Sequence, residues 1–223
     1  MVKLVAFDWN GTLFADTYAC LDAVNQVLEN FEVKPINVTQ YQQYFTVPIV
    51  GLYQGLGFEK EFILQNISKI SHIFHSFYEP RALKVRTRKG TKKVLEYLAK
   101  KQIQCLIFSN HVTEAIQFQL KRLKIEKYFS KVLANSEQDS ALKERHKEKS
   151  LQNFIKEQRL KPHQVLVVGD AQEEVEIGKK LGAITVALTG GNYTTARLKA
   201  AKPDYLIDNL GEIISIVNKL NKI

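Results

Sequence analysis

Three apolar runs in this chain each end in side chains that could take part in phosphoryl chemistry. The end groups are Asp8, the pair Ser109-Asn110, and Asp170 after Gly169. A carboxylate can attack phosphorus to form an acyl phosphate, which divides one difficult displacement into two easier ones. Two carboxylates beside a phosphate repel it unless a hard cation such as Mg²⁺ intervenes. Hydroxyl and amide groups can donate to the phosphoryl oxygens, and a lysine can neutralise the remaining charge.

The elements that carry these groups must bring them together. From Gly90 onward, apolar runs and segments of helical periodicity alternate, which is typical of a parallel sheet covered by helices on both faces. In such a sheet, ligands bind beyond the carboxyl ends of the strands, where the strand order reverses. The expected strands are residues 2–8, 103–109, 131–134, 165–169, 184–188 and 205–207, and the expected helices are 91–100, 112–123, 149–158, 173–181 and 210–220.

The stretch between the first two strands lacks this alternation and is expected to be helical. An amphipathic helix is predicted over residues 17–31, and a second over residues 58–78, closed by Pro80. The sequence thus predicts a three-layer α/β/α sandwich with a parallel, Rossmann-like sheet and an inserted all-helical domain. The predicted division is a core of residues 1–15 and 85–223 and a cap of residues 16–84.

Taken jointly, the motifs match a known superfamily. The segment Asp8-Trp9-Asn10-Gly11-Thr12-Leu13 resembles the first motif of the haloacid-dehalogenase superfamily, and Ser109-Asn110 resembles the second. The segment Gly169-Asp170-Ala171-Gln172-Glu173-Glu174 resembles the fourth. The resemblance spans the chain, and the helical insertion is similar to that of the phosphoglycolate-phosphatase-like branch. It implies a Mg²⁺-dependent hydrolase that acts on a small phosphorylated metabolite.

The resemblance also implies a role for each matching residue. Asp8 would be the nucleophile and a Mg²⁺ ligand, the main-chain carbonyl of Asn10 a second ligand, and Asp170 a third. Glu174 would bind the metal or orient its waters. Ser109 and Asn110 would hold the transferred phosphoryl group. A lysine of the third motif completes the set: Lys147 is favoured by its position before the 165–169 strand, with Lys149 and Lys143 as alternatives.

Asn10 departs from the pattern of the phosphatases in this superfamily. They carry aspartate at this position, as a general acid that protonates the leaving oxygen, and an amide cannot do this. General acid–base assistance is worth about 10²–10⁴-fold. Its loss hurts least for aryl phosphates, acyl phosphates and pyrophosphates, which leave without a proton.

Three interpretations of Asn10 follow, of which the first is favoured. The chain is a phosphatase that uses a good leaving group or takes its proton from the cap or from water. Alternatively, it resembles the phosphonatases or the dehalogenases; the former have an Asp-Trp pair, like Asp8-Trp9, but their cap lysine is not identifiable here. The dehalogenases dispense with Mg²⁺, whereas Asp170 and Glu174 indicate that the metal site is kept. Finally, the chain could be a catalytically weakened protein that binds a phosphorylated ligand.

Two loops of unusual composition are candidates for a role in binding. Residues 44–57 are rich in aromatic residues and glycine, so they either face the site from the cap or form ordinary packing between helices. Gly190-Gly191-Asn192 follows a predicted strand and could be mistaken for a phosphate loop, but a turn at the end of the sheet explains it.

Composition limits the classes of partner and the cellular compartment that we expect. The formal charge is +9 and the pI is about 9.4, but the basic residues are scattered and no nucleic-acid reader motif accompanies them, so we expect no nucleic-acid partner. No apolar run is long enough to span a membrane. Cys20 and Cys105 show no metal-ligand spacing, which favours two buried thiols and a reducing cytoplasm. The substrate and the oligomeric state are left open by the sequence.

Overall fold

A computed structural model describes residues 1–136 and 147–222. Its six-stranded sheet is parallel throughout, with the order β3-β2-β1-β4-β5-β6. The strand order reverses at β1, as expected for a Rossmann-like sheet. The strands are β1 (Leu4–Phe7), β2 (Gln104–Val112), β3 (Lys131–Asn135), β4 (Val165–Gly169), β5 (Ile184–Leu188) and β6 (Tyr205–Ile207).

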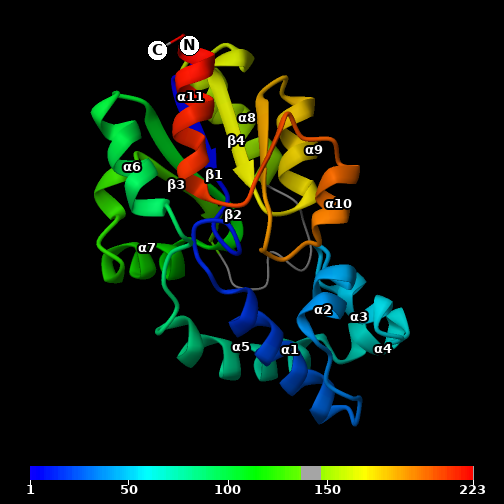
Figure 1. Ribbon diagram of the computed structural model, residues 1–223. Coiled ribbons are helices and arrows are strands. Elements are labelled where there is room, and N and C mark those ends of the chain that lie inside the picture. Colours follow the sequence, from blue (N-terminus) through cyan, green and yellow to red (C-terminus); the bar gives the residue numbers. More distant parts are fainter. Residues whose placement is uncertain (137–146, 223) are drawn as a thin grey trace.

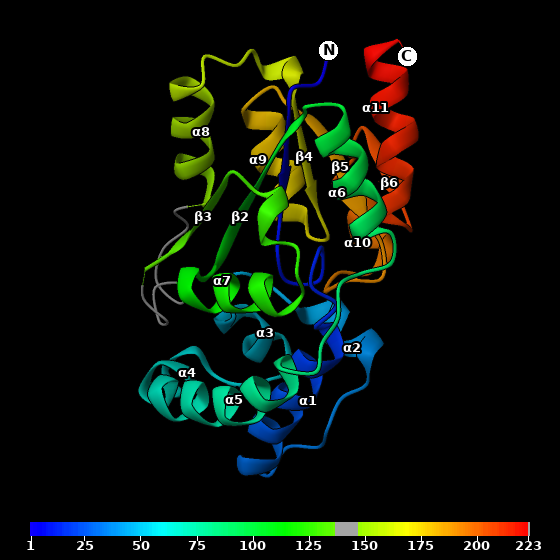
Figure 2. The ribbon, with the colours of Figure 1, turned by 90° about the vertical axis from the view of Figure 1, so that its left-hand side faces the viewer.

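Helices cover both faces of this sheet, which confirms the three-layer α/β/α prediction. The helix α8 lies on one side and α11 on the other (Figure 2). The helices and 3-10 turns of the second half of the chain are α6 (Thr91–Lys100), α7 (Thr113–Arg122), η1 (Glu126–Tyr128), α8 (Lys147–Glu157), η3 (Pro162–Gln164), α9 (Gln172–Lys180), α10 (Thr195–Ala200), η4 (Leu210–Glu212) and α11 (Ile213–Asn221).

Alternation along each strand builds the two sides of the core. In β1, Val5 and Phe7 pack into the cluster shared with α6, α7 and α11, whereas Leu4 and Ala6 pack into the cluster shared with α8 and α9. Successive side chains of a strand point to opposite faces, so a strand buried on both sides must be apolar at every position. This requirement explains why β1 reads as one continuous apolar run.

Five of the helices between β1 and β2 lie together beyond the carboxyl ends of the strands (Figure 1). They form a hydrophobic cluster of their own, built around residues such as Val24, Tyr41 and Ile63. The helices are α1 (Thr17–Asn30), α2 (Val38–Tyr44), α3 (Val50–Gly55), α4 (Lys60–Gln65) and α5 (Ile67–Ala82).

The boundaries differ from the expectations in a few places. Pro80 does not close the second long helix, because it lies inside α5, which ends at Ala82. A proline removes one backbone donor but need not end a helix that stops two residues later. The expected 58–78 helix is divided at Asn66 into α4 and α5. The last expected helix begins as the 3-10 turn η4, and β2 continues past Ser109 to Val112.

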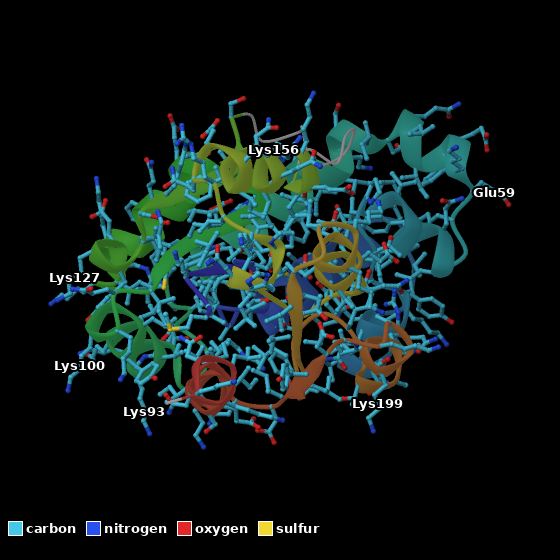
Figure 3. All side chains as sticks on the ribbon, turned by 90° about the horizontal axis from the view of Figure 1, so that it is seen from above. Glu59, Lys93, Lys100, Lys127, Lys156 and Lys199 are labelled. Carbon is cyan, nitrogen blue, oxygen red and sulfur yellow. The ribbon has the colours of Figure 1, made fainter. Side chains whose placement is uncertain are left out.

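The basic side chains are spread over the surface. Lys93 and Lys100 of α6, Lys127 of η1, Lys156 of α8 and Lys199 of α10 point away from the molecule in different directions (Figure 3). The absence of a nucleic-acid partner stays a prediction. Among the described residues, no helix has both the length and the apolar character that crossing a membrane requires.

Candidate active site

The carboxyl ends of β1, β2 and β4 lie side by side and carry the polar groups singled out in the sequence. Phe7 pairs with Ile107 of β2 on one side and with Val168 of β4 on the other. Asp8 follows Phe7 directly, and Asp170 comes two residues after Val168. The parallel register therefore brings Asp8 and Asp170 to the same edge of the sheet, at the point where the strand order reverses.

A buried lysine from a distant part of the chain holds Asp8. The ammonium group of Lys147, the first residue of α8, lies 2.6 Å from Asp8 Oδ1 and also donates to Glu174 Oε1. The Lys147 side chain is only 2% exposed. Lys149 lies exposed on the surface, and Lys143 falls outside the described residues. Of the two candidate lysines that the structure describes, Lys147 is the one at Asp8.

The hydroxyl group of Thr12 contacts both Asp8 and Asp170. Thr12 Oγ1 donates to Asp170 Oδ1 at 2.8 Å and lies 3.3 Å from Asp8 Oδ2. Both carboxylates are buried, at 7% and 1% exposure. Because a single hydroxyl reaches both of them, the two acids lie close enough to face a common ligand.

The backbone around Gly11 and residues 191–192 lies close to the second carboxylate oxygen of Asp170. The N–H of Asn192 donates to Asp170 Oδ2 at 2.5 Å. A Cβ atom placed on Gly11 or on Gly191 would come within 2.2 Å of the same oxygen, so both positions require glycine. Residues 190–192, interpreted from the sequence as a plain turn, therefore also hold a carboxylate of this cluster.

Burial makes the charged forms of these acids costly. It raises the pKa of Asp170 to about 7, and the charge of Glu174 adds to the rise. It also raises the pKa of Asp8 and of Glu174, although the ammonium of Lys147 opposes the rise. Burial alone would lower the pKa of Lys147, but the charges of Asp8, Glu174 and Glu173 outweigh it and raise that pKa. The cluster holds more acids than one lysine neutralises, and a further cation would stabilise their charged forms.

The donor types of the cluster fit Mg²⁺, which takes oxygen ligands. Carboxylates of Asp8, Asp170 and Glu174 and the carbonyl of Asn10 are all of this kind. Within residues 1–136 and 147–222, however, no three His, Cys, Asp or Glu side chains are arranged as a ready-made metal centre. Instead, Lys147 pairs with two of the acids and Thr12 bridges Asp8 to Asp170. The cluster therefore suits a hard cation by the type and charge of its donors, although these donors are not arranged as a preformed coordination shell.

Ser109 and Asn110 make different hydrogen bonds in the structure. Both residues line the cavity at the strand ends. Ser109 Oγ accepts the N–H of His111 at 3.1 Å, a bond that leaves the hydroxyl proton for another acceptor. The Asn110 amide donates to Glu173 Oε2 at 2.8 Å, so this group already has an acceptor in the structure.

Asn10 contacts a buried carboxylate that the sequence did not single out. Asn10 Nδ2 lies 2.5 Å from Asp16 Oδ2 and 3.2 Å from the Tyr78 hydroxyl oxygen. Asp16 is fully buried and also accepts from Tyr78 at 2.7 Å and from the N–H of Gly11 at 2.8 Å. Asn10 therefore serves as a donor to Asp16, which an ionised aspartate in its place could not do.

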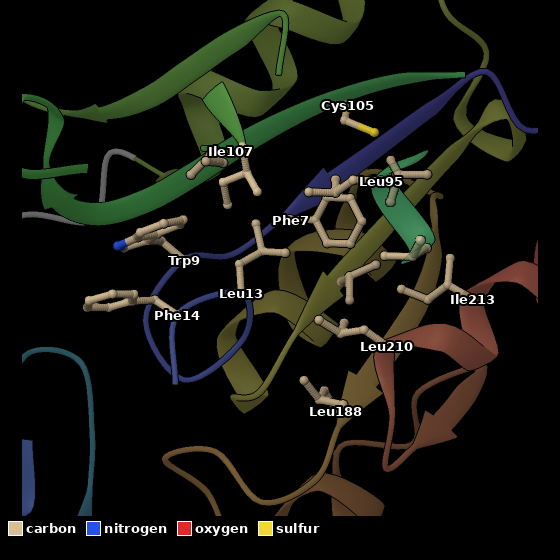
Figure 4. Close-up of a cluster of buried hydrophobic side chains, with 14 of the residues drawn as sticks. Phe7, Trp9, Leu13, Phe14, Leu95, Cys105, Ile107, Leu188, Leu210 and Ile213 are labelled. Atoms are coloured by element: carbon tan, nitrogen blue, oxygen red, sulfur yellow. The ribbon is translucent and has the colours of Figure 1, made fainter. Parts of the chain in front are cut away.

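Trp9 belongs to the core and not to the cavity. Its side chain is 0% exposed and stacks on Phe14, with ring centroids 5.1 Å apart. Figure 4 shows the two rings face to face at the edge of the apolar cluster that contains Leu13 and Ile107. Packing thus accounts for the tryptophan that follows Asp8.

A cavity of about 230 Å³ lies between the strand ends and the helical stretch. The core supplies its polar end, which includes Asp8, Ser109, Lys147 and Asp170. Residues of the 44–57 segment, among them Phe45 and Ile49, line the opposite end, so this segment does face the site.

Several residues of this arrangement escaped the sequence analysis. Thr12 lies within the first motif but was given no role, and Tyr78 was assigned only to a helix. Asp16 precedes α1 and has the sequence signal of an ordinary helix cap, although its side chain makes no capping bond. Asn192 follows two glycines after β5, and this Gly-Gly-Asn at a strand end was the one available signal.

Comparison with known proteins agrees with this arrangement. A family model described as haloacid dehalogenase-like hydrolase matches residues 5–188. A phosphoglycolate phosphatase of Vibrio vulnificus is 23% identical over 97% of this chain and 96% of its own length. The pyrophosphatase PpaX of Bacillus mycoides is 22% identical over 99% of each chain.

Solved structures share the fold over the whole chain. A haloacid dehalogenase-like family hydrolase from Streptococcus pneumoniae superposes with a TM-score of 0.80 at 20% identity, and covers 97% of this chain and 98% of its own. A predicted phosphatase from Clostridium acetobutylicum gives 0.81 at 16% identity, with 98% and 99% covered. Because the family model spans most of the chain, from the first strand of the sheet to the fifth, the protein belongs to the haloacid dehalogenase-like hydrolases.

Proposed function

We propose that this hydrolase is a Mg²⁺-dependent phosphatase that moves the phosphoryl group of a small phosphorylated molecule first to Asp8 and then to water. The observation that carries the proposal is the 2.6 Å contact between Asp8 and Lys147 inside a cavity between the sheet and the helical stretch. The ammonium of Lys147 favours the ionised form of Asp8 against the effect of burial, beside the space that a substrate would fill, and only the ionised carboxylate is a nucleophile.

The chain's own residues would divide the chemistry as follows. One oxygen of Asp8 attacks phosphorus, the bond from phosphorus to the leaving oxygen breaks, and an acyl phosphate forms on Asp8. Water then attacks the same phosphorus, the acyl bond breaks, and Asp8 is regenerated with release of phosphate. Lys147 and the hydroxyl of Ser109 would stabilise the negative oxygens of the transferred group.

Mg²⁺ would be held by the carboxylates of Asp8 and Asp170 and the carbonyl of Asn10, with Glu174 bound directly or through water. Bound there, the cation would neutralise charge on the phosphoryl oxygens and on the acids. The burial of Asp170 and Glu174 and their raised pKa values support this assignment. The names of two relatives, a phosphoglycolate phosphatase and a pyrophosphatase, also describe enzymes that act on phosphate compounds.

The helical stretch would work as a cap. We propose a core of residues 1–15 and 85–223 and a cap of residues 16–84, because the inserted helices have a hydrophobic cluster of their own. Gln42 donates to the carbonyl of Gly191 at 2.7 Å, and Arg197 donates to the carbonyl of Phe45 at 2.8 Å, so the cap is in contact with the core around the cavity. Such a cap would exclude water during the first transfer.

A cytoplasmic location is proposed from the chemistry of the two thiols. Cys20 and Cys105 are both free, and burial raises the pKa of each. Cys105 is buried, whereas Cys20 is only partly buried, unlike the expectation from the sequence, and free thiols are typical of a reducing compartment.

The test compares wild type with Asp8→Asn on a panel of phosphate esters and anhydrides with Mg²⁺. We expect Asp8→Asn to lower turnover about 10³-fold or more, and Asp208→Asn, the same change at an exposed site, to leave it unchanged. Rapid quenching followed by mass mapping should find a phosphoryl group on the peptide that contains Asp8. Equal rates for wild type and Asp8→Asn would refute the proposal, and tight binding without turnover would show a phospho-ligand-binding protein instead.

A further inference from the structure

We propose that the leaving group of the substrate is an uncharged, apolar alcohol, and most favourably an aromatic one. This proposal rests on the phosphatase function above and concerns the end of the cavity that faces the cap. Two independent observations carry it: the apolar lining supplied by the cap, and the engagement of Asn10 by a buried carboxylate.

Beside six residues that carry a polar atom (Cys20, Thr46, Tyr53, Ser71, His75 and Tyr78), the cap lines its end of the cavity with apolar side chains. They come from the segment between α2 and α3 and from α5, and they include Phe45, Val47, Ile49, Ile67, Ile70 and Phe74. Phe74 also stacks on Tyr78, with ring centroids 5.4 Å apart, which fixes a flat aromatic wall. An aromatic or aliphatic group placed here would leave water and gain about 25 cal/mol for each Å² buried.

Charge is the second feature of this end. Among the described residues of the cap, none that lines the cavity is a lysine or an arginine. His75 Nδ1 lies 3.2 Å from Glu79 Oε1, and burial lowers the pKa of His111, so that this imidazole favours its neutral form. Lys147 is already bound by Asp8 and Glu174. A second anionic group on the substrate, whether a carboxylate or a phosphate, would therefore be buried at this end without a lysine or arginine of the cap to pair with it, which is costly.

Asn10 leads to the same class of substrate by a different route. Because its amide donates to Asp16 and carries no transferable proton, Asn10 cannot protonate the leaving oxygen, and this favours a group that can depart as an anion. An aryloxide is stable enough for this, whereas an alkoxide is not. The leaving groups of pyrophosphates and acyl phosphates also depart readily. In a pyrophosphate, however, the leaving group is itself an anionic phosphate that would lie at the cap end of the cavity. The apolar lining thus favours aryl phosphates over pyrophosphates among the substrates that Asn10 permits.

The balance of the reaction needs no further reactant. The oxygen of Asp8 bonds to phosphorus while the phosphorus–oxygen bond to the ring breaks, and the electron pair leaves on the aryloxide. Water supplies its oxygen to the acyl phosphate and its protons to the products. The sum is aryl phosphate plus water giving the phenol and inorganic phosphate.

Binding can be measured without turnover, which separates this inference from the phosphatase function. Benzylphosphonate and 3-phosphonopropionate cannot be hydrolysed, and they imitate a neutral aromatic ester and a carboxylated ester. We expect calorimetry with Mg²⁺ to give a Kd for benzylphosphonate about tenfold to a hundredfold lower than for 3-phosphonopropionate. Equal affinity, or tighter binding of the carboxylated compound, would overturn the inference whatever the enzyme hydrolyses.

A lysine introduced into the apolar lining should reverse the preference. Ile49→Lys places a positive charge at the cap end, so kcat/KM should fall about tenfold or more for phenyl phosphate and rise for phosphoglycolate. Leu64→Lys is the matched control, because Leu64 is 51% exposed and lies outside the cavity. An unchanged ratio of the two kcat/KM values in Ile49→Lys would overturn the inference. Absence of turnover for every ester, with benzylphosphonate still preferred, would overturn the phosphatase function and leave the binding preference standing.

Discussion

The side-chain amide of Asn10 donates a 2.5 Å hydrogen bond to the carboxylate of Asp16, a residue that is fully buried. Within the described residues, Asp16 accepts from four neutral donors: the Asn10 amide, the Tyr78 hydroxyl, the Cys20 thiol and the N–H of Gly11. A buried carboxylate held by neutral donors depends on each of them. The residue that departs from the family pattern is therefore part of the local structure.

Replacing Asn10 with aspartate should destabilise the protein. Asn10→Asp turns a donor into an acceptor next to Asp16, so two buried carboxylates would face each other. We expect the free energy of unfolding to fall by about 1–3 kcal/mol, measured by urea denaturation at pH 7. Adding Asp16→Asn restores a donor opposite an acceptor and should recover most of the loss. Equal stability of Asn10→Asp and wild type would contradict the proposed role of this pair.

The same double substitution should change the preference for leaving groups. With Asp16→Asn present as a donor, Asn10→Asp supplies a carboxyl group that can carry a proton to the leaving oxygen. We expect kcat/KM for alkyl phosphates to rise up to about 10²-fold, and that for aryl phosphates to change much less, because aryloxides need no proton. The ratio of the two kcat/KM values is the measurement, and Asp16→Asn alone is the control. A parallel rise for both ester types would show that Asn10 does not limit protonation.

Strand positions could be predicted because burial on both faces leaves little freedom in the sequence. Val165–Gly169 and Ile184–Leu188 have the expected bounds, since each is an apolar run limited by turn residues. Helix ends were harder to predict. Residues 147 and 148 belong to α8 although the helix was expected to begin at Lys149, because a polar first turn has the same composition as a loop.

The clearest sequence signal for the site is a polar residue at the end of a strand. Asp8 and Asp170 have this signal, and the sheet register brings them together. The contact between Asn10 and Tyr78 joins residues 68 positions apart, and that between Tyr41 and Asn192 joins residues 151 apart. No local pattern encodes such pairs, because the packing of the inserted helices against the strand ends creates them.

Lys147 and Lys149 offer a matched pair for testing the buried lysine. Lys147→Ala leaves Asp8 and Glu174 without their cation, and breaking such a buried pair costs about 3–5 kcal/mol of stability. Lys149→Ala, two residues further along α8 at an exposed position, should change stability by less than about 0.5 kcal/mol. We expect phosphatase turnover to be lost in the first variant and kept in the second. Equal effects of the two substitutions in both urea denaturation and turnover would contradict the assignment of Lys147.

Mg²⁺ should stabilise the folded protein through the acids around Lys147. An ion that binds the native state alone adds about 2.7 kcal/mol of stability at one hundred times its Kd, which appears as a rise in Tm. We expect this rise for wild type, and we expect Asp170→Asn to abolish most of it, because Asp170 loses a charged oxygen that faces Asp8 across Thr12. Asp208→Asn makes the same chemical change at an exposed site and should keep the full rise. Because the measured quantity is Tm, the test does not depend on turnover. An equal rise in Tm with Mg²⁺ in all three proteins would show that the ion binds elsewhere than at the strand ends.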